Sequence, residues 1–153
     1  DDGLNYTVNG NAYLAEDPSS GAPRMPAVGE VLINEYLPDF KNYPNEFIEL
    51  YNTTIEDLDI SGMYLDDIIG GGSAPIQIPA STIIQANDYY VYNISGYYLN
   101  NAGDDVNLLG IDGSTVYDST TYTSSKDDKS IGRLPDGNEW YSRFMSPSPG
   151  APN

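Results

Sequence analysis

Hydrophobic and polar residues alternate in short runs from Gly29 onward, and turn-forming residues separate the runs. This period of two is typical of half-buried β-strands. No window of about eleven residues has the periodicity of an amphipathic helix. The pattern predicts strands over Glu30–Tyr36, Glu46–Asn52, one or two within Leu58–Asp66, Ile76–Ile78, Thr82–Gln85, Tyr89–Asn93, Val106–Leu109, Thr115–Tyr122, Ser130–Leu134 and Glu139–Phe144.

Two of the turns predict hairpins. Asp112-Gly113 joins the strands before and after it, because both residues accept the positive φ of a tight hairpin turn. Pro135-Asp136-Gly137-Asn138 joins the last two strands in the same way. Many short strands punctuated by turns indicate an all-β antiparallel sandwich or barrel.

The N-terminal part of the chain has a different composition. Residues 1–28 end in a stretch rich in Pro, Ser, Gly and Ala, so we predict a linker or N-terminal extension here and a domain over 29–153. The extension has room for a single strand at Tyr6–Val8 or Ala12–Leu14. Because Asp1 is neither an initiator Met nor part of a signal-peptide pattern, we expect a segment of a longer protein.

The stretch N-E-F-I-E-L-Y-N (45–52) places two glutamates three residues apart. In an extended strand, Ile48 and Leu50 share one face while Glu49 lies on the other. Glu46 and Glu49 therefore project from opposite faces and cannot flank one substrate bond. We expect the acidic side chains, as a group, to face solvent.

Carboxylates on neighbouring strands can come closer together than two on the same strand. Glu35 and Glu49 on neighbouring strands would meet the separation of roughly 5 to 9.5 Å that glycosidases use, so a carboxylate-based hydrolase stays open as an alternative. The favoured interpretation is structural: Glu49 lies on an aromatic-rich face and pairs with Arg133 or Arg143.

The residues expected in the core follow from the alternation. They are Ile33, Ile48, Leu50, Leu65, Val91, Val106, Leu108 and Trp140. If Trp140 is a core residue, replacing it by Ala should lower the free energy of unfolding by about 3–5 kcal/mol.

Composition excludes several kinds of chemistry. The 153 residues contain no Cys and no His, so cysteine nucleophiles, Ser–His–acid triads and zinc held by these residues are absent. The net charge of −17 argues against nucleic acid and anionic membranes as partners. No apolar run approaches the roughly 20 residues of a membrane span, so we expect no membrane insertion in this segment.

Three pairs of aspartates in predicted turns are weak candidates for calcium, which needs several clustered oxygens. They are Asp66 and Asp67, Asp104 and Asp105, and Asp127 and Asp128. The simpler interpretation is that these loops are only solvated, and no other cofactor is expected. The 14 tyrosines include a group that would make a sugar-stacking platform, namely Tyr89, Tyr90, Tyr92, Tyr97 and Tyr98, although Tyr is also an ordinary strand residue.

The order of several segments resembles the lamin-tail domain family. The segments are V-L-I-N-E-Y (31–36), N-E-F-I-E-L-Y-N (45–52), L-D-I-S-G-M-Y-L-D-D (58–67), I-P-A-S-T-I-I-Q-A-N-D-Y-Y-V-Y (78–92), L-N-N-A-G-D-D-V-N-L-L (99–109), V-Y-D-S-T-T-Y (116–122), S-I-G-R-L-P-D-G-N-E-W (130–140) and S-P-G-A-P-N (148–153). In the family a Trp usually follows the Ser61-Gly62 turn, whereas Met63-Tyr64 follows it here, so that core contact is made differently.

The resemblance implies an Ig-like antiparallel β-sandwich without catalytic residues. Such modules accompany secreted bacterial and archaeal proteins as attachment or interaction units. The lamin version also engages DNA, a role that this chain is not expected to share because it lacks a basic patch.

We therefore expect a non-catalytic, extracellular or cell-surface module of a larger exported protein, of archaeal or halotolerant origin, that binds protein or cell-envelope polymer. The alternative is a carbohydrate-binding module that uses its tyrosines, with calcium as a structural ion.

Overall fold

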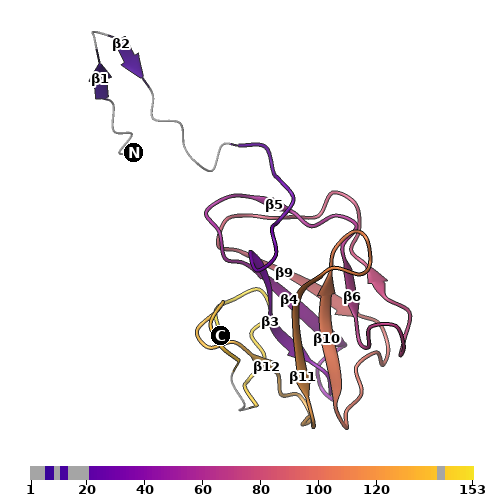
Figure 1. Cartoon of the computed structure of the whole chain (residues 1–153). Helices are drawn as coiled ribbons and strands as arrows, with labels where there is room; N and C mark the ends of the chain where they lie inside the picture. Colours follow the sequence, from indigo (N-terminus) through magenta and orange to yellow (C-terminus); the bar gives the residue numbers. More distant parts are fainter. Residues whose placement is uncertain (1–5, 9–10, 14–20, 141–143) are drawn as a thin grey trace.

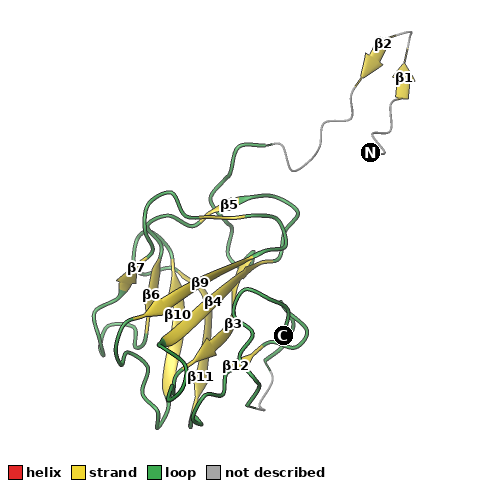
Figure 2. Cartoon of the chain, turned by 180° about the vertical axis from the view of Figure 1, so that it is seen from behind, coloured by secondary structure: helices red, strands yellow, loops and turns green. Residues whose placement is uncertain are grey.

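The computed structural model describes residues 6–8, 11–13, 21–140 and 144–153. In these ranges every regular element is a β-strand (Figure 2). The described residues contain no helix of the length and apolar character needed to cross a membrane. The all-β prediction is confirmed.

The strands agree closely with the predicted ranges. They are β1 (Tyr6–Val8), β2 (Asn11–Tyr13), β3 (Val31–Leu37), β4 (Glu46–Asn52), β5 (Leu58–Asp59), β6 (Tyr64–Asp66), β7 (Ile76–Gln77), β8 (Ile83–Ile84), β9 (Tyr89–Ile94), β10 (Asp104–Leu109), β11 (Val116–Tyr122) and β12 (Ile131–Gly132). Two strands, β1 and β2, pair where the sequence predicts one.

Two antiparallel four-stranded sheets form the domain, with strand orders β11-β10-β6-β7 and β12-β3-β4-β9. Figure 1 shows them stacked, with β3 and β4 behind β10 and β11. A short pair, β5 and β8, lies beside them. This is the predicted sandwich, and the arrangement is consistent with an Ig-like fold.

The core fills the space between the two sheets. Its buried members are Val31, Ile33, Tyr36, Ile48, Leu50, Leu58, Ile60, Met63, Leu65, Ile78, Ile84, Ile94, Leu99, Val106, Leu108 and Tyr122. Six of the eight predicted core residues are among them. Met63, which follows the Ser61-Gly62 turn, is fully buried and fills part of this space.

Two of the predicted core residues, Val91 and Trp140, are not among the buried residues of the core. Val91 pairs with Glu49 on the outer face of its sheet and is only partly buried, so its assignment to the core is wrong. Trp140 is partly buried and packs against the core from its margin. Side chains alternate between the two faces of β9, and Tyr90 and Tyr92 are the ones that point inward and pack on the core. Val91, between them, therefore points outward.

Both predicted hairpins are present. Gly113 has a φ of +67°, and the Asp112 carboxylate accepts hydrogen bonds from the backbone N–H groups of Ser114 and Thr115 at 2.9 Å. In the last hairpin, Gly137 has a φ of +72°, and Arg133 pairs with Trp140 in an antiparallel bridge. Of the predicted strand Glu139–Phe144, Trp140 forms only the bridge to Arg133, Glu139 and Phe144 are not in a strand, and 141–143 lie outside the described residues.

Candidate functional site

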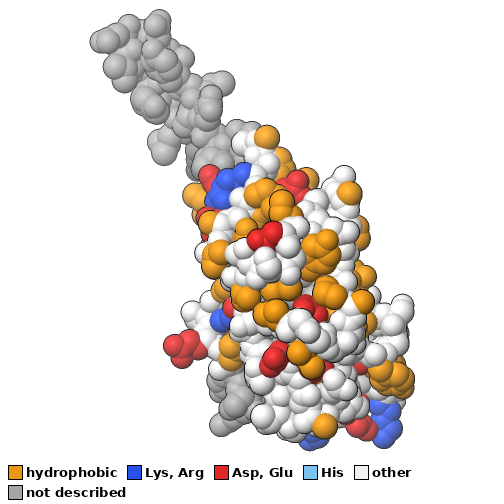
Figure 3. Space-filling model, turned by 45° about the vertical axis from the view of Figure 1, so that its right-hand side comes forward, with side chains coloured by type: hydrophobic (Ala, Val, Ile, Leu, Met, Phe, Trp, Pro, Cys, Tyr) orange, Lys and Arg blue, Asp and Glu red, His pale blue; other side chains and the backbone are white. Residues whose placement is uncertain are grey.

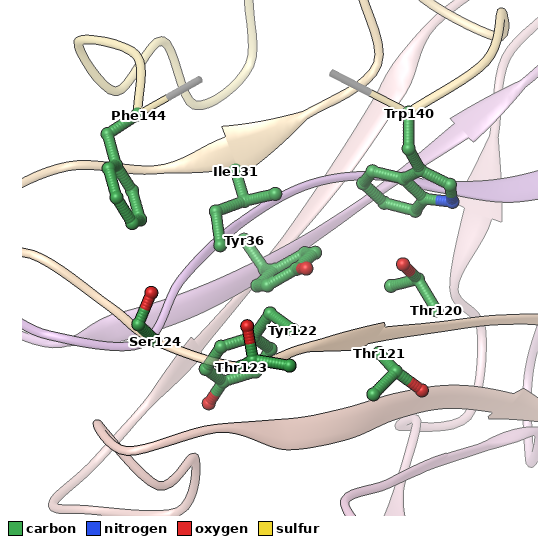
Figure 4. A pocket seen from close by; sticks show the side chains of 9 residues that line it. All are labelled: Tyr36, Thr120, Thr121, Tyr122, Thr123, Ser124, Ile131, Trp140 and Phe144. Atoms are coloured by element: carbon green, nitrogen blue, oxygen red, sulfur yellow. The ribbon is translucent and has the colours of Figure 1, made fainter. Parts of the chain in front are cut away.

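An aromatic cavity lies at one seam of the sandwich, where the edge strand β11 faces β12 of the other sheet (Figure 4). Its volume is about 330 Å³. Its walls are Tyr36, Thr120, Thr121, Tyr122, Thr123, Ser124, Ile131, Trp140 and Phe144. We call this cavity the seam pocket. It combines apolar walls with a rim of hydroxyl groups, a composition common in binding sites.

Three aromatic rings build the inner wall of the seam pocket. The Tyr36 ring lies 5.4 Å from that of Tyr122 and 5.5 Å from that of Trp140, measured between centroids. Both distances fall in the favourable range for aromatic pairs. Figure 4 shows Tyr36 between the two sheets, with Trp140 and Phe144 projecting toward the cavity from the segment beyond β12.

The Tyr36 hydroxyl lacks a hydrogen-bond partner among the described residues although it is buried. The Thr120 side chain lies close enough to lower the pKa of this hydroxyl, but no hydrogen bond of good geometry joins the two groups. Burial raises the pKa of Tyr36, so the hydroxyl stays protonated. A buried hydroxyl without a partner is unfavourable, and a ligand group in the seam pocket would relieve that cost.

Beside the pocket, contacts among Asp118, Arg133 and Trp140 join the two sheets. The Arg133 guanidinium contacts both oxygens of Asp118, at 3.0 and 3.2 Å, and donates from Nε to the carbonyl of Ile33 at 2.9 Å. Asp118 also accepts the backbone N–H of Ile33 at 2.8 Å. The guanidinium lies 4.5 Å from the centroid of the Trp140 ring. Residues from both sheets thus position one wall of the pocket.

Sequence reasoning missed the seam pocket. Its members come from β3, β11, β12 and the segment after β12, and no local motif links them. The available signal was the stretch S-T-T-Y-T-S (119–124), which carries no charge in a strongly acidic chain.

Glu46 and Glu49 project from opposite faces of β4, as predicted. The Glu46 carboxylate accepts the backbone N–H groups of Tyr98 and Leu99, both at 2.9 Å. Glu49 accepts hydrogen bonds from the Asn34 side chain at 3.0 Å and from the backbone of Gly150 at 2.6 Å. The predicted pairing of Glu49 with Arg133 is wrong, because Arg133 is engaged with Asp118, and Arg143 lies outside the described residues.

Glu35 and Glu49 face each other across β3 and β4, and both are fully buried. The C-terminal segment covers them: the backbone N–H of Ser148 donates to both oxygens of Glu35 at 3.1 Å. The Ser130 hydroxyl also donates to Glu35. The expectation that the acids face solvent is therefore wrong for this pair and for Glu46, which is also fully buried. It is wrong as well for three buried aspartates, Asp66, Asp67 and Asp104.

Burial raises the pKa of both glutamates. For Glu49 the pKa rises to about 7, because desolvation outweighs the hydrogen bonds from Asn34 and Gly150, and the charges of Glu35 and Asp136 add to the shift. For Glu35 desolvation is again the main cause. A carboxyl pair of this kind has the electronic character of a catalytic dyad, but the C-terminal segment closes it off from solvent.

Most of the six aspartates considered for calcium already accept hydrogen bonds or form an ion pair. Asp67 accepts the N–H groups of Ile68 and Ser73, and Asp104 accepts that of Asn100. Asp128 accepts those of residues 41–43, which hold its pKa well below the usual range. Asp66 is buried, Asp105 accepts from Thr121, and Asp127 pairs with Lys41. In the described ranges, no three Asp, Glu, His or Cys side chains group to hold a metal ion.

The five tyrosines of the predicted platform do not share one face. Tyr89 pairs with Tyr51 on the outer face, whereas Tyr90 and Tyr92 pack against the core. Tyr92, Tyr97 and Tyr98 do line one cavity, of about 410 Å³, together with Ser73, Ala74, Ile76, Asn93, Ile94 and Ser95.

One known protein family matches most of the chain. The model of the Lamin Tail Domain family matches residues 24–124, about two thirds of the chain. The chain belongs to the lamin-tail domain family. The match starts before the predicted boundary at Gly29, at Arg24, whose backbone already bonds to Asp57 and Asp59.

No curated protein and no solved structure matches this lamin-tail domain. The family match includes Tyr36 and the β11 wall of the seam pocket. It ends before Ile131, Trp140 and Phe144, so the opposite wall is built by a part of the chain beyond the matched span.

Proposed function

We propose that this lamin-tail domain is a non-catalytic binding module of a secreted or cell-surface protein, and that it binds a protein or cell-envelope polymer at the seam pocket. The observation that carries the proposal is an aromatic cavity with a buried hydroxyl that lacks a partner, next to the free edge of β11. A module that acts by binding needs such a surface and no reacting group.

The charge of the molecule supports an extracellular setting. A net charge of −17 keeps a protein soluble in salty surroundings, including those of archaeal or halotolerant cells. On the face shown in Figure 3, acidic and hydrophobic side chains are interspersed, and basic ones are few. Neither feature favours nucleic acid as the partner.

A blocked pocket tests the proposal. Ser124 is exposed at the rim, so Ser124→Trp fills the cavity mouth without altering the core. Ser114→Trp, in the exposed β10–β11 turn, is the matched control. The probes are decapeptides selected from a displayed library and the soluble oligosaccharides cellohexaose and chitohexaose, with affinity measured by calorimetry.

We expect at least one class of probe to bind and Ser124→Trp to weaken it about tenfold or more, while Ser114→Trp has no effect. Absence of binding by every probe, or equal binding to both variants, contradicts the proposal. Thermal melting of each variant shows that it remains folded.

Carbohydrate binding is the second candidate, and the cavity of Tyr92, Tyr97 and Tyr98 favours it. Tyr97 is 82% exposed, and its ring stacks on that of Phe40 at 5.2 Å, which presents a rigid aromatic surface. Tyr97→Ala should abolish binding of the two oligosaccharides if they use this surface. Repeating the titration with calcium and with a chelator tests whether an ion contributes.

A further inference from the structure

The free edge of β11 borders the mouth of the seam pocket. β11 is the last strand of its sheet, and β10 is its only sheet neighbour among the described strands. The partner sheet ends at β12, which is two residues long and is flanked by the bridges from Ser130 to Met145 and from Arg133 to Trp140. An extended segment laid along β11 would therefore run across the opening between the two sheets.

The alternation of β11 determines where the side chains of such a segment point. Tyr122 faces the core, and Thr120, two residues away, shares that face and lines the seam pocket. Neighbouring strands of a sheet present their side chains in the same two layers. Every second side chain of an added strand would consequently enter the cavity between Tyr36, Trp140 and Phe144.

From residue 119 onward the edge carries none of the usual devices that prevent pairing, although a β-bulge interrupts β11 between Val116 and Asp118. Natural edge strands are protected by Lys, Pro or inward-pointing charges. Asp118 is such an inward charge, but it is neutralised by Arg133, and residues 119–124 contain no charge and no Pro. Among the described residues, no backbone group pairs with the outer edge of this part of β11, so its main-chain groups can pair with a partner.

The interior of the pocket selects a side chain with an apolar body and a polar tip. The walls are aromatic, and the Tyr36 hydroxyl has no hydrogen bond of good geometry among the described residues. Tyr or Trp supplies both properties. Because the chain carries 23 acidic residues against 6 basic ones, Lys or Arg beside this anchor adds attraction at long range.

We propose that the partner is an extended peptide segment that pairs with the free edge of β11 as an additional strand and inserts an aromatic side chain into the seam pocket. This inference rests on the proposed function, because it names the class of partner of that same site. Main-chain pairing provides affinity, and the anchor provides specificity.

N-methyl scanning of a bound peptide tests the inference. A decapeptide selected from a displayed library against the purified chain is resynthesised with one N-methyl group at each position in turn. Only alternate amides of an added strand point to β11, so the affinity should fall about tenfold at every second position and little at the others. Replacing the anchor by Ser should weaken binding to a similar extent.

Loss of affinity without a period of two, or selected peptides that bind Ser124→Trp as well as the native chain, overturns strand pairing at this edge. If only cellohexaose or chitohexaose binds, and Ser124→Trp abolishes it, the peptide inference is wrong while the seam pocket remains the binding site. If no probe binds, the proposed function is contradicted as well.

Discussion

Arg133 holds the two sheets together at the seam. Its guanidinium contacts Asp118 of one sheet and the Ile33 carbonyl of the other, donates to the Asn138 carbonyl, and lies over the Trp140 ring. Only Arg combines a planar fork of donors with a surface that stacks on an aromatic ring. The pair is nearly buried, with side chains 10% and 14% exposed.

Replacing Arg133 should lower stability strongly, since the nearly buried carboxylate of Asp118 would lose its countercharge. We expect Arg133→Ala to lower the free energy of unfolding by about 3 kcal/mol or more, and Arg133→Lys to recover only part of that loss. Chemical denaturation measures both. Arg24→Ala is the control, because Arg24 forms ion pairs at the exposed surface and should matter far less. Equal effects at the two sites would refute this role of Arg133.

Glu49 should make stability depend on pH. Its pKa is about 7 in the folded chain and about 4.5 in the unfolded chain, so the folded state binds more protons between these values. Its contribution is fully present below pH 4.5 and is lost as the pH rises through 7, by at most about 3 kcal/mol. Denaturation curves from pH 4.5 to 8 should show this decline, and Glu49→Gln should reduce it. An unchanged slope in the variant would show that Glu49 is ionised throughout.

At the level of elements, the sequence predicts strands well and their neighbours poorly. Alternation located the ranges of β3, β4, β9 and β11 to within two residues, since local patterning sets where a strand begins and ends. It placed Ile48 and Glu49 on opposite faces. It did not reveal that the C-terminal segment covers the face that carries Glu49. A segment rich in Pro and Gly has no hydrophobic periodicity, so its sequence does not predict the surface on which it packs.

The C-terminal segment should stabilise the domain chiefly at acidic pH. Ser148 and Gly150 donate to Glu35 and Glu49, and Asn153 donates to the Arg133 carbonyl at 2.9 Å. Removing residues 147–153 should cost about 2 kcal/mol or more at pH 5. The cost should be smaller at pH 7, because water then solvates the two freed carboxylates. Thermal melting at both pH values measures the difference, with Asn153→Ala as a control that loses one side chain. A larger loss at pH 7 than at pH 5 would contradict this account of the segment.

In the whole molecule, a β-sandwich leaves two seams where its sheets do not close on each other. At one seam, the contacts of Asp118 and Arg133 join the sheets, and the seam pocket lies beside them. The sequence could predict the sandwich, since a chain of many short antiparallel strands forms few architectures other than a sandwich or a barrel. It could not predict the pocket, because Tyr36, Thr120 and Trp140 meet only through the order of strands in two sheets.

The measurement that tests the central claim most directly is residue-resolved hydrogen–deuterium exchange of the chain, free and bound to a selected decapeptide. We expect alternate amides of β11 to exchange quickly in the free chain and to become protected in the complex, while those of β9, the edge strand of the other sheet opposite β12, are unchanged. Protection at β9 instead, or no change along β11 at saturating peptide, would contradict this claim.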